Sequence, residues 1–564
     1  MKKNIHLLII FIFFCFSAVA QTFNRGASKE HKKIYRESQS ITAQIKNSFE
    51  MMVDKSQPEI GGIQIFSPEV LPEFYFNRDY RPAWVDYKSF VDALQGLENS
   101  LYDGLNPKDY HAVKINELIN MLYQEFQGNE FDIKKVAYLD ILLTDAVLLY
   151  AYHLLQGKVN PETLDANWNY SFKQIQDDAP YKLEKAVETA TVSNELKKLR
   201  PDNRTYGASM EKLEFYREIE KSGGWENIPE GKTIHTGDDD ERIPLIRKRL
   251  SITSELNVLN NTGAVNYDSL LVQDIKNFQF RNGLKPDGVI GPGTLEVLNI
   301  SVEDRINTLR VNLERNRWID SDLSDNYVIV NIAAFKAYYM VNHQPRFSTN
   351  VQVGRTYTKT PVFKDRLRYI EFNPTWTVPV SIIRKSIIPK MKNDPDYISK
   401  NNFELIDRSG KIVPQSAIDV DNLNISNFHY TVRQKPGKHN ALGEVKFIFP
   451  NKHSVYLHDT PSKSLFEKEE RAFSHGCIRT QYPLDLAEVL LDDDQWNRTR
   501  IDSVIQTRIT TRVFPEKDID VLIMYWTAGF LENEGFGFFR DVYDRDGRIL
   551  TQLNRTGVMR RPGD

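Results

Sequence analysis

Cysteine is almost absent from this chain of 564 residues, which contains only Cys15 and Cys477. Two cysteines exclude the multi-disulfide framework that holds many small secreted domains together. Cys15 lies in an apolar N-terminal segment that we expect to be removed. Cys477 would then have no partner within the chain, which makes it a candidate reactive thiol. The alternative is a buried cysteine that acts as a small hydrophobic residue.

An excess of either charge is also missing, since 73 Lys and Arg face 76 Asp and Glu and the formal net charge is -3. This balance gives no electrostatic footprint for nucleic acid, which we do not expect as a partner. The hydrophobic fraction of 41% and the charged fraction of 26% are ordinary for a globular protein. At about 100 to 200 residues per domain, the length predicts about three domains.

The N-terminus has the layout of an export signal. Two lysines precede an apolar run from Leu7 to Phe16, and small residues follow up to Ala20. We expect a signal peptide over residues 1–20, cleaved after Ala20, and a location in the periplasm or cell envelope. An uncleaved membrane anchor is the alternative, although residues 5–20 are fewer than the roughly 20 that a spanning helix needs.

The rest of the chain divides by its hydrophobic period. Residues 30–235 read as an α-helical domain, whose clearest helix runs from Leu139 to Leu155 and stops at Gly157. A polar, turn-rich stretch precedes a compact three-helix unit over residues 240–300. A helical connector over 301–324 leads to a β-rich, sandwich-like domain over 325–550, in which we expect a hairpin turn at Asp546-Gly547. The predicted fold class is therefore multidomain α+β.

A long excursion rich in Pro, Lys and Asn interrupts the β-rich domain at about residues 377–437. Its composition suggests a mobile flap or cap near the functional site.

The residues around Cys477 suit nucleophilic catalysis. A free thiol is only slightly ionised at neutral pH, so a catalytic cysteine needs a base or a positive charge nearby. His475 precedes it by two positions, and His458 lies on a strand-like segment nineteen positions upstream. Gly476 allows sharp backbone geometry, and N–H groups around it could face a developing oxyanion. Asp459 is expected to form a turn, because adjacent strand residues point to opposite faces.

A metal site is the competing hypothesis, because His453, His458, Asp459, His475 and Cys477 are all ligand types. None of these residues has a recurrent zinc-binding spacing, so we expect no metal and no cofactor.

Two stretches resemble known families. "VQDIKNFQFRNGLKPDGVIGPGTLEVLN", residues 272–299, is similar to the common peptidoglycan-binding domain. "HDTPSKSLFEKEERAFSHGCIR" resembles the signature of L,D-transpeptidases with a YkuD-type catalytic domain. "VGRTYTKTPVF", "FNPTWTVP" and "RQKPGKHNALGEVKFIFPN" resemble the large, YcbB-like branch of that family, in which the insert over 377–437 is similar to a cap on the substrate cleft.

The resemblance implies a role for each residue of the motif. Cys477 would be the nucleophile and His458 the general base and acid, while His475 and Gly476 would shape the oxyanion site and its loop. Arg479 and Ser474 would contact the substrate, although a structural salt bridge is an alternative for Arg479.

The family's reaction is a two-step exchange on peptidoglycan stem peptides. The cysteine attacks the third stem residue and releases D-Ala, and an amine of a neighbouring stem resolves the thioester to give a 3-3 crosslink. The expected partners are therefore donor and acceptor stems, a carboxypeptidase that supplies tetrapeptides, and carbapenems as acylating agents. The alternatives are an L,D-carboxypeptidase that uses water, or a non-catalytic scaffold protein that binds the cell wall.

Overall fold

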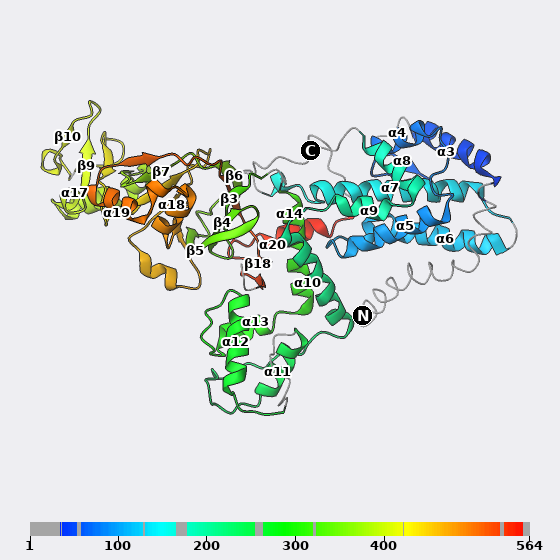
Figure 1. Cartoon of the computed structure of the whole chain (residues 1–564), viewed down its shortest axis with the longest axis horizontal. Coiled ribbons are helices and arrows are strands. Elements are labelled where there is room, and N and C mark those ends of the chain that lie inside the picture. Colours follow the sequence, from blue (N-terminus) through cyan, green and yellow to red (C-terminus); the bar gives the residue numbers. More distant parts are fainter. Residues whose placement is uncertain are drawn as a thin grey trace.

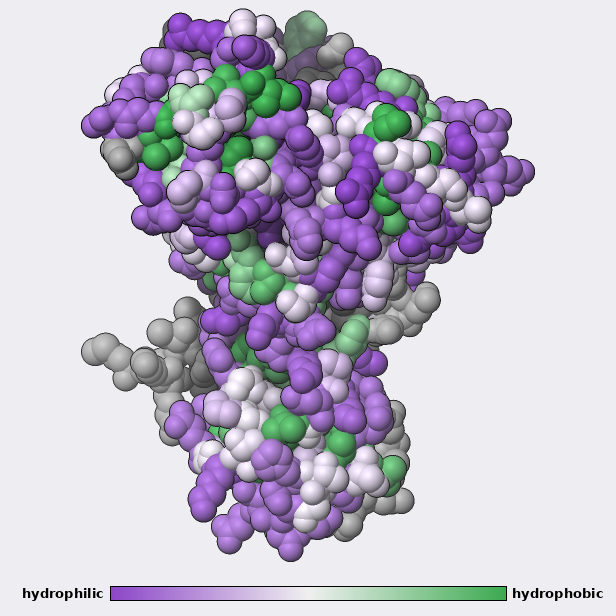
Figure 2. Space-filling model, turned by 90° about the vertical axis from the view of Figure 1, so that its left-hand side faces the viewer, coloured by the Kyte–Doolittle hydropathy of each residue, from purple (hydrophilic) through white to green (hydrophobic). Residues whose placement is uncertain are grey.

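The computed structural model describes residues 34–556 apart from 35, 53–57, 128–129, 165–177, 254–262, 320–322, 421 and 531–534. The expected signal peptide and Cys15 lie outside these residues. The chain forms three lobes: a helical lobe, a smaller three-helix lobe and a β-rich lobe (Figure 1). They meet around α14 (Val302–Arg317) and α20 (Asp546–Leu553). Figure 2 views the β-rich lobe end-on, above the smaller lobe and a narrow waist, and apolar surface is scattered over both.

The helical lobe is built around α7 (Ile133–Gln156), whose first turn is capped by Asp132 and whose last is closed by Gly157 at φ 84°. This confirms the helix predicted from Leu139 to Leu155. The helix is long and apolar enough to cross a membrane, but 78% of its most apolar window is buried, as in a core helix. The other elements of this lobe are α3 (Ser38–Met52), β1 (Glu59–Ile60), β2 (Ile63–Gln64), α4 (Val70–Asn77), α5 (Tyr87–Glu98), η1 (Asn99–Leu101), η2 (Pro107–Tyr110), α6 (Ala112–Gln127), η3 (Pro161–Thr163), α8 (Ala179–Thr189) and α9 (Val192–Lys198), and α10 (Arg204–Lys221) packs against α14.

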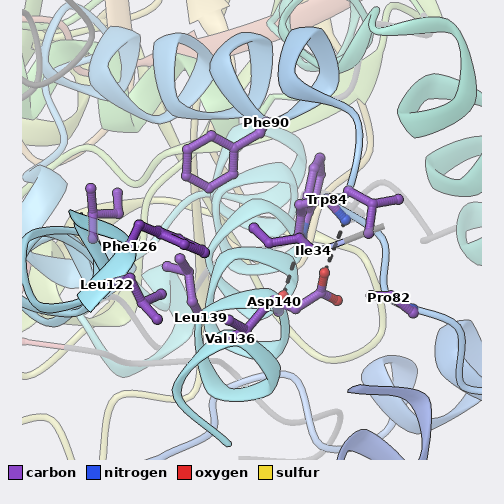
Figure 3. A pocket seen from close by; sticks show the side chains of 11 residues that line it. Ile34, Pro82, Trp84, Phe90, Leu122, Phe126, Val136, Leu139 and Asp140 are labelled. Carbon is purple, nitrogen blue, oxygen red and sulfur yellow. Dashed lines mark hydrogen bonds between the residues drawn. The ribbon is translucent and has the colours of Figure 1, made fainter. Parts of the chain in front are cut away.

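A small cavity lies in this lobe beside Asp140 (Figure 3). The carboxylate of Asp140 accepts hydrogen bonds from the main-chain N–H groups of Ala83 and Trp84 at 3.0 and 2.9 Å and from the Tyr75 hydroxyl at 2.6 Å. The cavity measures about 40 Å³, close to the volume of one water molecule, and its walls are mostly apolar. It is a packing defect in the core and not a substrate site.

The second lobe holds α11 (Ile243–Ile252), α12 (Ser269–Arg281) and α13 (Pro292–Leu298), which enclose their own apolar core. Gln279 of α12 is buried and joins the helices to the loop before α13. Its amide donates to Asp287 Oδ1, Val289 O and Thr294 Oγ1, and its carbonyl accepts the Gly288 N–H at 2.8 Å. The "FQ" and "DGVIGP" elements of the motif therefore hold the bundle together.

Helix α14 lies within the helical connector predicted over residues 301–324 and contacts more than one lobe. It begins at Ser301, whose Oγ accepts the Asp304 N–H at 3.0 Å, and its C-terminal half is buried although it is rich in Asn, Glu and Arg. Asn312 binds both the N–H and the hydroxyl of Thr527 in the β-rich lobe, at 2.9 and 2.8 Å. Glu314 accepts the Val159 N–H of the helical lobe at 2.7 Å. Buried polar groups need such partners, so α14 fixes the lobes to each other.

The predicted multidomain α+β fold class is confirmed, and the β-rich lobe contains one eleven-stranded sheet. The strand order is β16-β7-β12-β13-β15-β5-β4-β3-β17-β6, and β14 pairs with β5. The strands are β3 (Asn326–Asn331), β4 (Lys336–Val341), β5 (Gln344–Gly354), β6 (Phe363–Arg366), β7 (Tyr369–Phe372), β12 (Val445–Ile448), β13 (Leu457–His458), β14 (Ala472–Ser474), β15 (Ile478–Thr480), β16 (Thr511–Val513) and β17 (Asp520–Met524). The remaining elements are η6 (Lys463–Glu467), α18 (Pro483–Leu491), η7 (Asp494–Trp496), α19 (Arg498–Thr507), and the hairpin β18 (Ala528–Phe530) and β19 (Phe536–Phe538).

The insert at about 377–437 is a folded subdomain with an apolar core of its own, and its movement as a flap stays a prediction. Its four-stranded sheet has the order β10-β9-β11-β8. Its two ends lie together, because Trp376 pairs with Gln434. The elements are β8 (Trp376–Thr377), α15 (Val380–Ile382), η4 (Ile383–Ile387), α16 (Ile388–Asn393), α17 (Tyr397–Lys400), β9 (Phe403–Ile406), β10 (Ile412–Val413), η5 (Gln415–Ala417) and β11 (Thr431–Gln434).

The predicted hairpin turn at Asp546-Gly547 is wrong, since these residues begin helix α20. Tertiary contacts override the local turn signal. Ile549 and Leu553 bury their side chains in the core of the helical lobe, and Asp546 pairs with Arg315 of α14 at 2.7 Å.

We expect Asn312→Ala to lower the free energy of unfolding by about 2 to 4 kcal/mol, because it leaves the buried N–H of Thr527 without an acceptor. Denaturant unfolding followed by tryptophan fluorescence measures the effect. The control is Glu303→Gln on the exposed first turn of α14, for which we expect a change within about 0.5 kcal/mol. Equal stability of the two variants would contradict the role assigned to α14.

Candidate active site

A parallel pairing of two short strands places Cys477 and His458 on one face of the sheet. Leu457 and His458 of β13 are in register with Ile478 and Arg479 of β15, and the Ile478 N–H also donates to Tyr456 O at 3.0 Å. Side chains alternate between faces along a strand, so Tyr456, His458, Cys477 and Arg479 share a face. The structure thus brings together three residues that the sequence singled out, and adds Tyr456.

Cys477 is a half-buried free thiol at the start of this pairing. Burial raises the pKa of the Cys477 thiol, and hydrogen bonds from Tyr456 together with the charges of Lys446 and Arg479 offset part of that rise. Sequence reasoning missed Tyr456 and Lys446. Tyr456 could have been found from its position two residues before His458. Lys446 could not, because it lies on the neighbouring strand β12, opposite His458.

His458 is buried and its tautomer is set by the main chain. Its Nδ1 lies 2.5 Å from the carbonyl oxygen of Asp459, which can only accept a hydrogen bond, so Nδ1 carries the proton and Nε2 the lone pair. The main chain of Leu442 is a second hydrogen-bonding neighbour of the ring. Burial first, and the positive charge of Arg479 second, lower the pKa of His458 to about 3. The imidazole is therefore neutral and has the tautomer of a base.

Asp459 stabilises the turn after β13, as expected from the sequence. Its side chain accepts the N–H groups of Glu444 and Thr460 at 2.9 and 2.6 Å and pairs with Lys463 at 2.6 Å. Only its main-chain carbonyl contacts His458.

Ser474 braces the loop that carries the thiol, although we expected it to contact substrate. It is buried, its hydroxyl donates to Cys477 O at 2.6 Å, and it accepts the Gly476 N–H at 3.0 Å. Gly476 has φ 120°, a conformation that favours glycine, and its carbonyl accepts the Thr360 hydroxyl at 2.8 Å. Because the Gly476 N–H is occupied, the main-chain N–H of Cys477, which has no acceptor among the described residues, is the better oxyanion donor.

His475 is exposed and makes no hydrogen bond through its side chain within the described part of the chain, so the loop support expected of it comes from Ser474 instead. Burial and the positive charges of Arg355, Arg479 and Lys385 lower the pKa of His475. Lys385 belongs to η4 of the insert, so the insert reaches the active-site entrance with a positive charge.

Arg479 has no carboxylate partner in the described residues, which argues against a structural salt bridge. Its Nη1 donates to Gln352 at 3.4 Å and its buried Nε makes no hydrogen bond. Burial lowers the pKa of Arg479. A partly buried guanidinium with an unused donor is suited to an anionic ligand. No group of three His, Cys, Asp or Glu side chains in the described ranges is placed to hold a metal ion.

Three family models match the chain. The model described as "L,D-transpeptidase catalytic domain" covers residues 325–505, "Putative peptidoglycan binding domain" covers 243–298 and "Scaffold domain" covers 69–213. The chain therefore contains an L,D-transpeptidase catalytic domain of the YkuD type and a peptidoglycan-binding domain. This confirms the two resemblances found in the sequence.

A curated relative from Haemophilus influenzae, named "Putative L,D-transpeptidase", is 25% identical over 527 residues, which make up 92% of this chain and 86% of the relative. Two solved L,D-transpeptidase structures, from Xylanimonas cellulosilytica and Stackebrandtia nassauensis, are 13% and 11% identical. Each match covers 52% of this chain and 99% or 94% of the other. Their TM-scores of 0.17 and 0.21 are too low to carry an argument.

The pKa directions predict how the thiol responds to pH. The pKa of Cys477 is raised, so the thiolate fraction and the alkylation rate should still be rising at about pH 9. No inflection is expected near the ordinary histidine pKa of about 6.5, because His458 stays neutral down to about pH 3. The measurement is the rate of iodoacetamide labelling at Cys477 by mass spectrometry. A plateau below about pH 8 would instead indicate a preformed thiolate–imidazolium pair.

Proposed function

We propose that this protein is a peptidoglycan L,D-transpeptidase that forms 3-3 crosslinks through a thioester on Cys477. The observation that carries the proposal is the thiol itself, on one sheet face with a neutral imidazole and with a guanidinium that has no carboxylate partner among the described residues. The matched domains support peptidoglycan as the substrate and the cell envelope as the location.

Cys477 Sγ attacks the carbonyl carbon of the third stem residue and passes its proton towards His458 Nε2. The oxyanion is held by the Cys477 N–H. As the intermediate collapses, the C–N bond to D-Ala breaks, His458 protonates the leaving amine and a thioester remains. An amine of a second stem then attacks the thioester, His458 takes its proton, and the thiol is regenerated.

The electrostatics of the site favour an anionic donor. Cys477 and His458 resist forming an ion pair at rest, because burial opposes charge on both. The charged side chains that act on the thiol or on His475 are Lys446, Arg479, Arg355 and Lys385, all of them cations. A substrate carboxylate among these cations would offset their field and make protonation of His458 easier. Binding of the correct stem would thereby activate the base.

The decisive experiment incubates the purified protein with disaccharide tetrapeptides and identifies the products by chromatography and mass. We expect crosslinked dimers and free D-Ala, and we expect Cys477→Ala to abolish both. Tripeptides without dimers would mean an L,D-carboxypeptidase. Equal products from wild type and Cys477→Ala would reject cysteine catalysis, and no turnover by either would favour a wall-binding scaffold. Acylation of Cys477 by a carbapenem is an independent test of thiol activation.

The cap subdomain is expected to serve the acceptor stem. Since Trp376 and Gln434 are paired, a short Gly-Ser linker can replace residues 378–432 without straining the sheet. We expect this variant to keep its fold and to release D-Ala, but to form at least about tenfold fewer dimers than the wild type. The loss corresponds to about 1.4 kcal/mol of acceptor binding. Normal crosslinking by the shortened protein would contradict a role for the cap, and circular dichroism controls for folding.

A further inference from the structure

A second cleft lies between the helical and β-rich lobes, lined by residues of α14, α20 and the loop after β5. It measures about 310 Å³, at the lower end of the range for small-molecule sites. Part of its wall is apolar, formed by Trp318, Val362, Met524 and Ile549. It is far larger than the core cavity in Figure 3 and can hold a ligand of modest size.

The polar part of the cleft is strongly positive. Arg315, Lys359, Arg545 and Arg548 line it, against a single lining acid, Asp544. Lys359 donates to Tyr543 O at 2.7 Å, and the Arg545 guanidinium lies 5.1 Å from the Tyr525 ring centre. Arg548 is exposed and makes no ion pair or hydrogen bond to any described residue.

Arg315 is the observation that points to a ligand. It is 5% exposed, and its Nη1 lies 2.7 Å from Asp546 and 3.3 Å from the Thr527 hydroxyl. Its Nη2 is buried and has no hydrogen-bond partner. Several arginines of the described residues have a buried donor without a hydrogen-bond partner, and Arg315 is the one among them that lines this cleft. Burying a charged donor without a hydrogen bond is costly. A ligand oxygen in the cleft would satisfy this donor.

We propose that the cleft binds a small amphiphilic anion, in which one carboxylate or phosphate is joined to an apolar body. The anionic group would lie between Arg315 and Arg548, and the apolar body against Trp318 and Val362. An anion without an apolar body would leave the apolar wall exposed to water. A neutral amphiphile would leave the Arg315 donor without an anionic acceptor.

The wall of the cleft continues to the catalytic loop. Lys359 and Pro361 line the cleft, and Thr360 between them donates to Gly476 O at 2.8 Å. The Thr360 N–H also donates to the Tyr543 hydroxyl at 3.2 Å, which in turn donates to Gly354 O at 2.5 Å. A ligand that shifts this segment acts directly on the residue before Cys477, so occupancy of the cleft should change the reactivity of the thiol.

The test is calorimetric titration of the purified full chain with octanoate and with octyl phosphate. Acetate and octyl glucoside are the controls without the apolar body and without the charge. We expect only the two amphiphilic anions to bind. Tighter binding of octanoate would identify a carboxylate source, and tighter binding of octyl phosphate a phosphate ester. Binding of neither anion, or equal binding of octyl glucoside, would overturn the proposal.

Variants keep the test specific to this cleft. Arg548→Glu reverses an exposed charge, and Leu164→Trp fills the apolar side, so each should weaken binding at least tenfold. The matched control is Arg346→Glu, an exposed arginine at the opposite end of the sheet from Met524, which should bind as the wild type does. Unchanged affinity in both cleft variants would show that the anion binds elsewhere.

The link to the thiol has its own readout, which does not require any crosslinking activity. Saturating ligand should change the iodoacetamide labelling rate of Cys477 at least twofold in the wild type and not in Arg548→Glu. An unchanged rate in a protein that binds the ligand would overturn the coupling.

Discussion

The short parallel pairing of β13 with β15 is the constraint on which the active site depends. It aligns His458 with Arg479. Tyr456 and Cys477, each two residues earlier along its own segment, therefore lie on the same face of the sheet. A slip of one residue would turn the thiol to the other face of the sheet. The loop before β15 is held in place, since the Thr360 hydroxyl donates to the Gly476 carbonyl and the Ser474 hydroxyl donates to the Cys477 carbonyl.

The positioned thiol is not an activated one. Burial makes an ion pair of Cys477 and His458 unfavourable, and the surrounding cations lower the proton affinity of the imidazole further. In the proposed mechanism Arg479, which has no carboxylate partner among the described residues, attracts an anionic substrate whose charge offsets part of that effect. In the proposed mechanism, substrate recognition is therefore coupled to the reactivity of the thiol, and the raised pKa limits unselective reactions of Cys477 while the site is empty.

Buried hydrogen bonds hold the lobes to each other. The same hydrogen bonds would contribute less on an exposed surface. Asn312 and Glu314 of α14 each bind a main-chain N–H from a different lobe. These contacts leave little freedom for independent motion around the junction. The positive cleft between α14 and α20 lies at this junction, and its loop also touches the catalytic loop. We therefore expect a ligand bound at this junction to affect the reactivity of Cys477.

Sequence alone singled out the candidate thiol and predicted the order of the lobes, because both depend on local information. The scarcity of cysteine, the "SHGCIR" motif and the change of hydrophobic period predicted the thiol, its histidine and the order of helical and β-rich parts. Tertiary structure alone decided what depends on distant partners. It placed Tyr456 and Lys446 at the sulfur, turned Ser474 inward and His475 outward, and left Arg479 unpaired. It also made Asp546-Gly547 a helix start, because burial of Ile549 and Leu553 outweighs a two-residue turn preference.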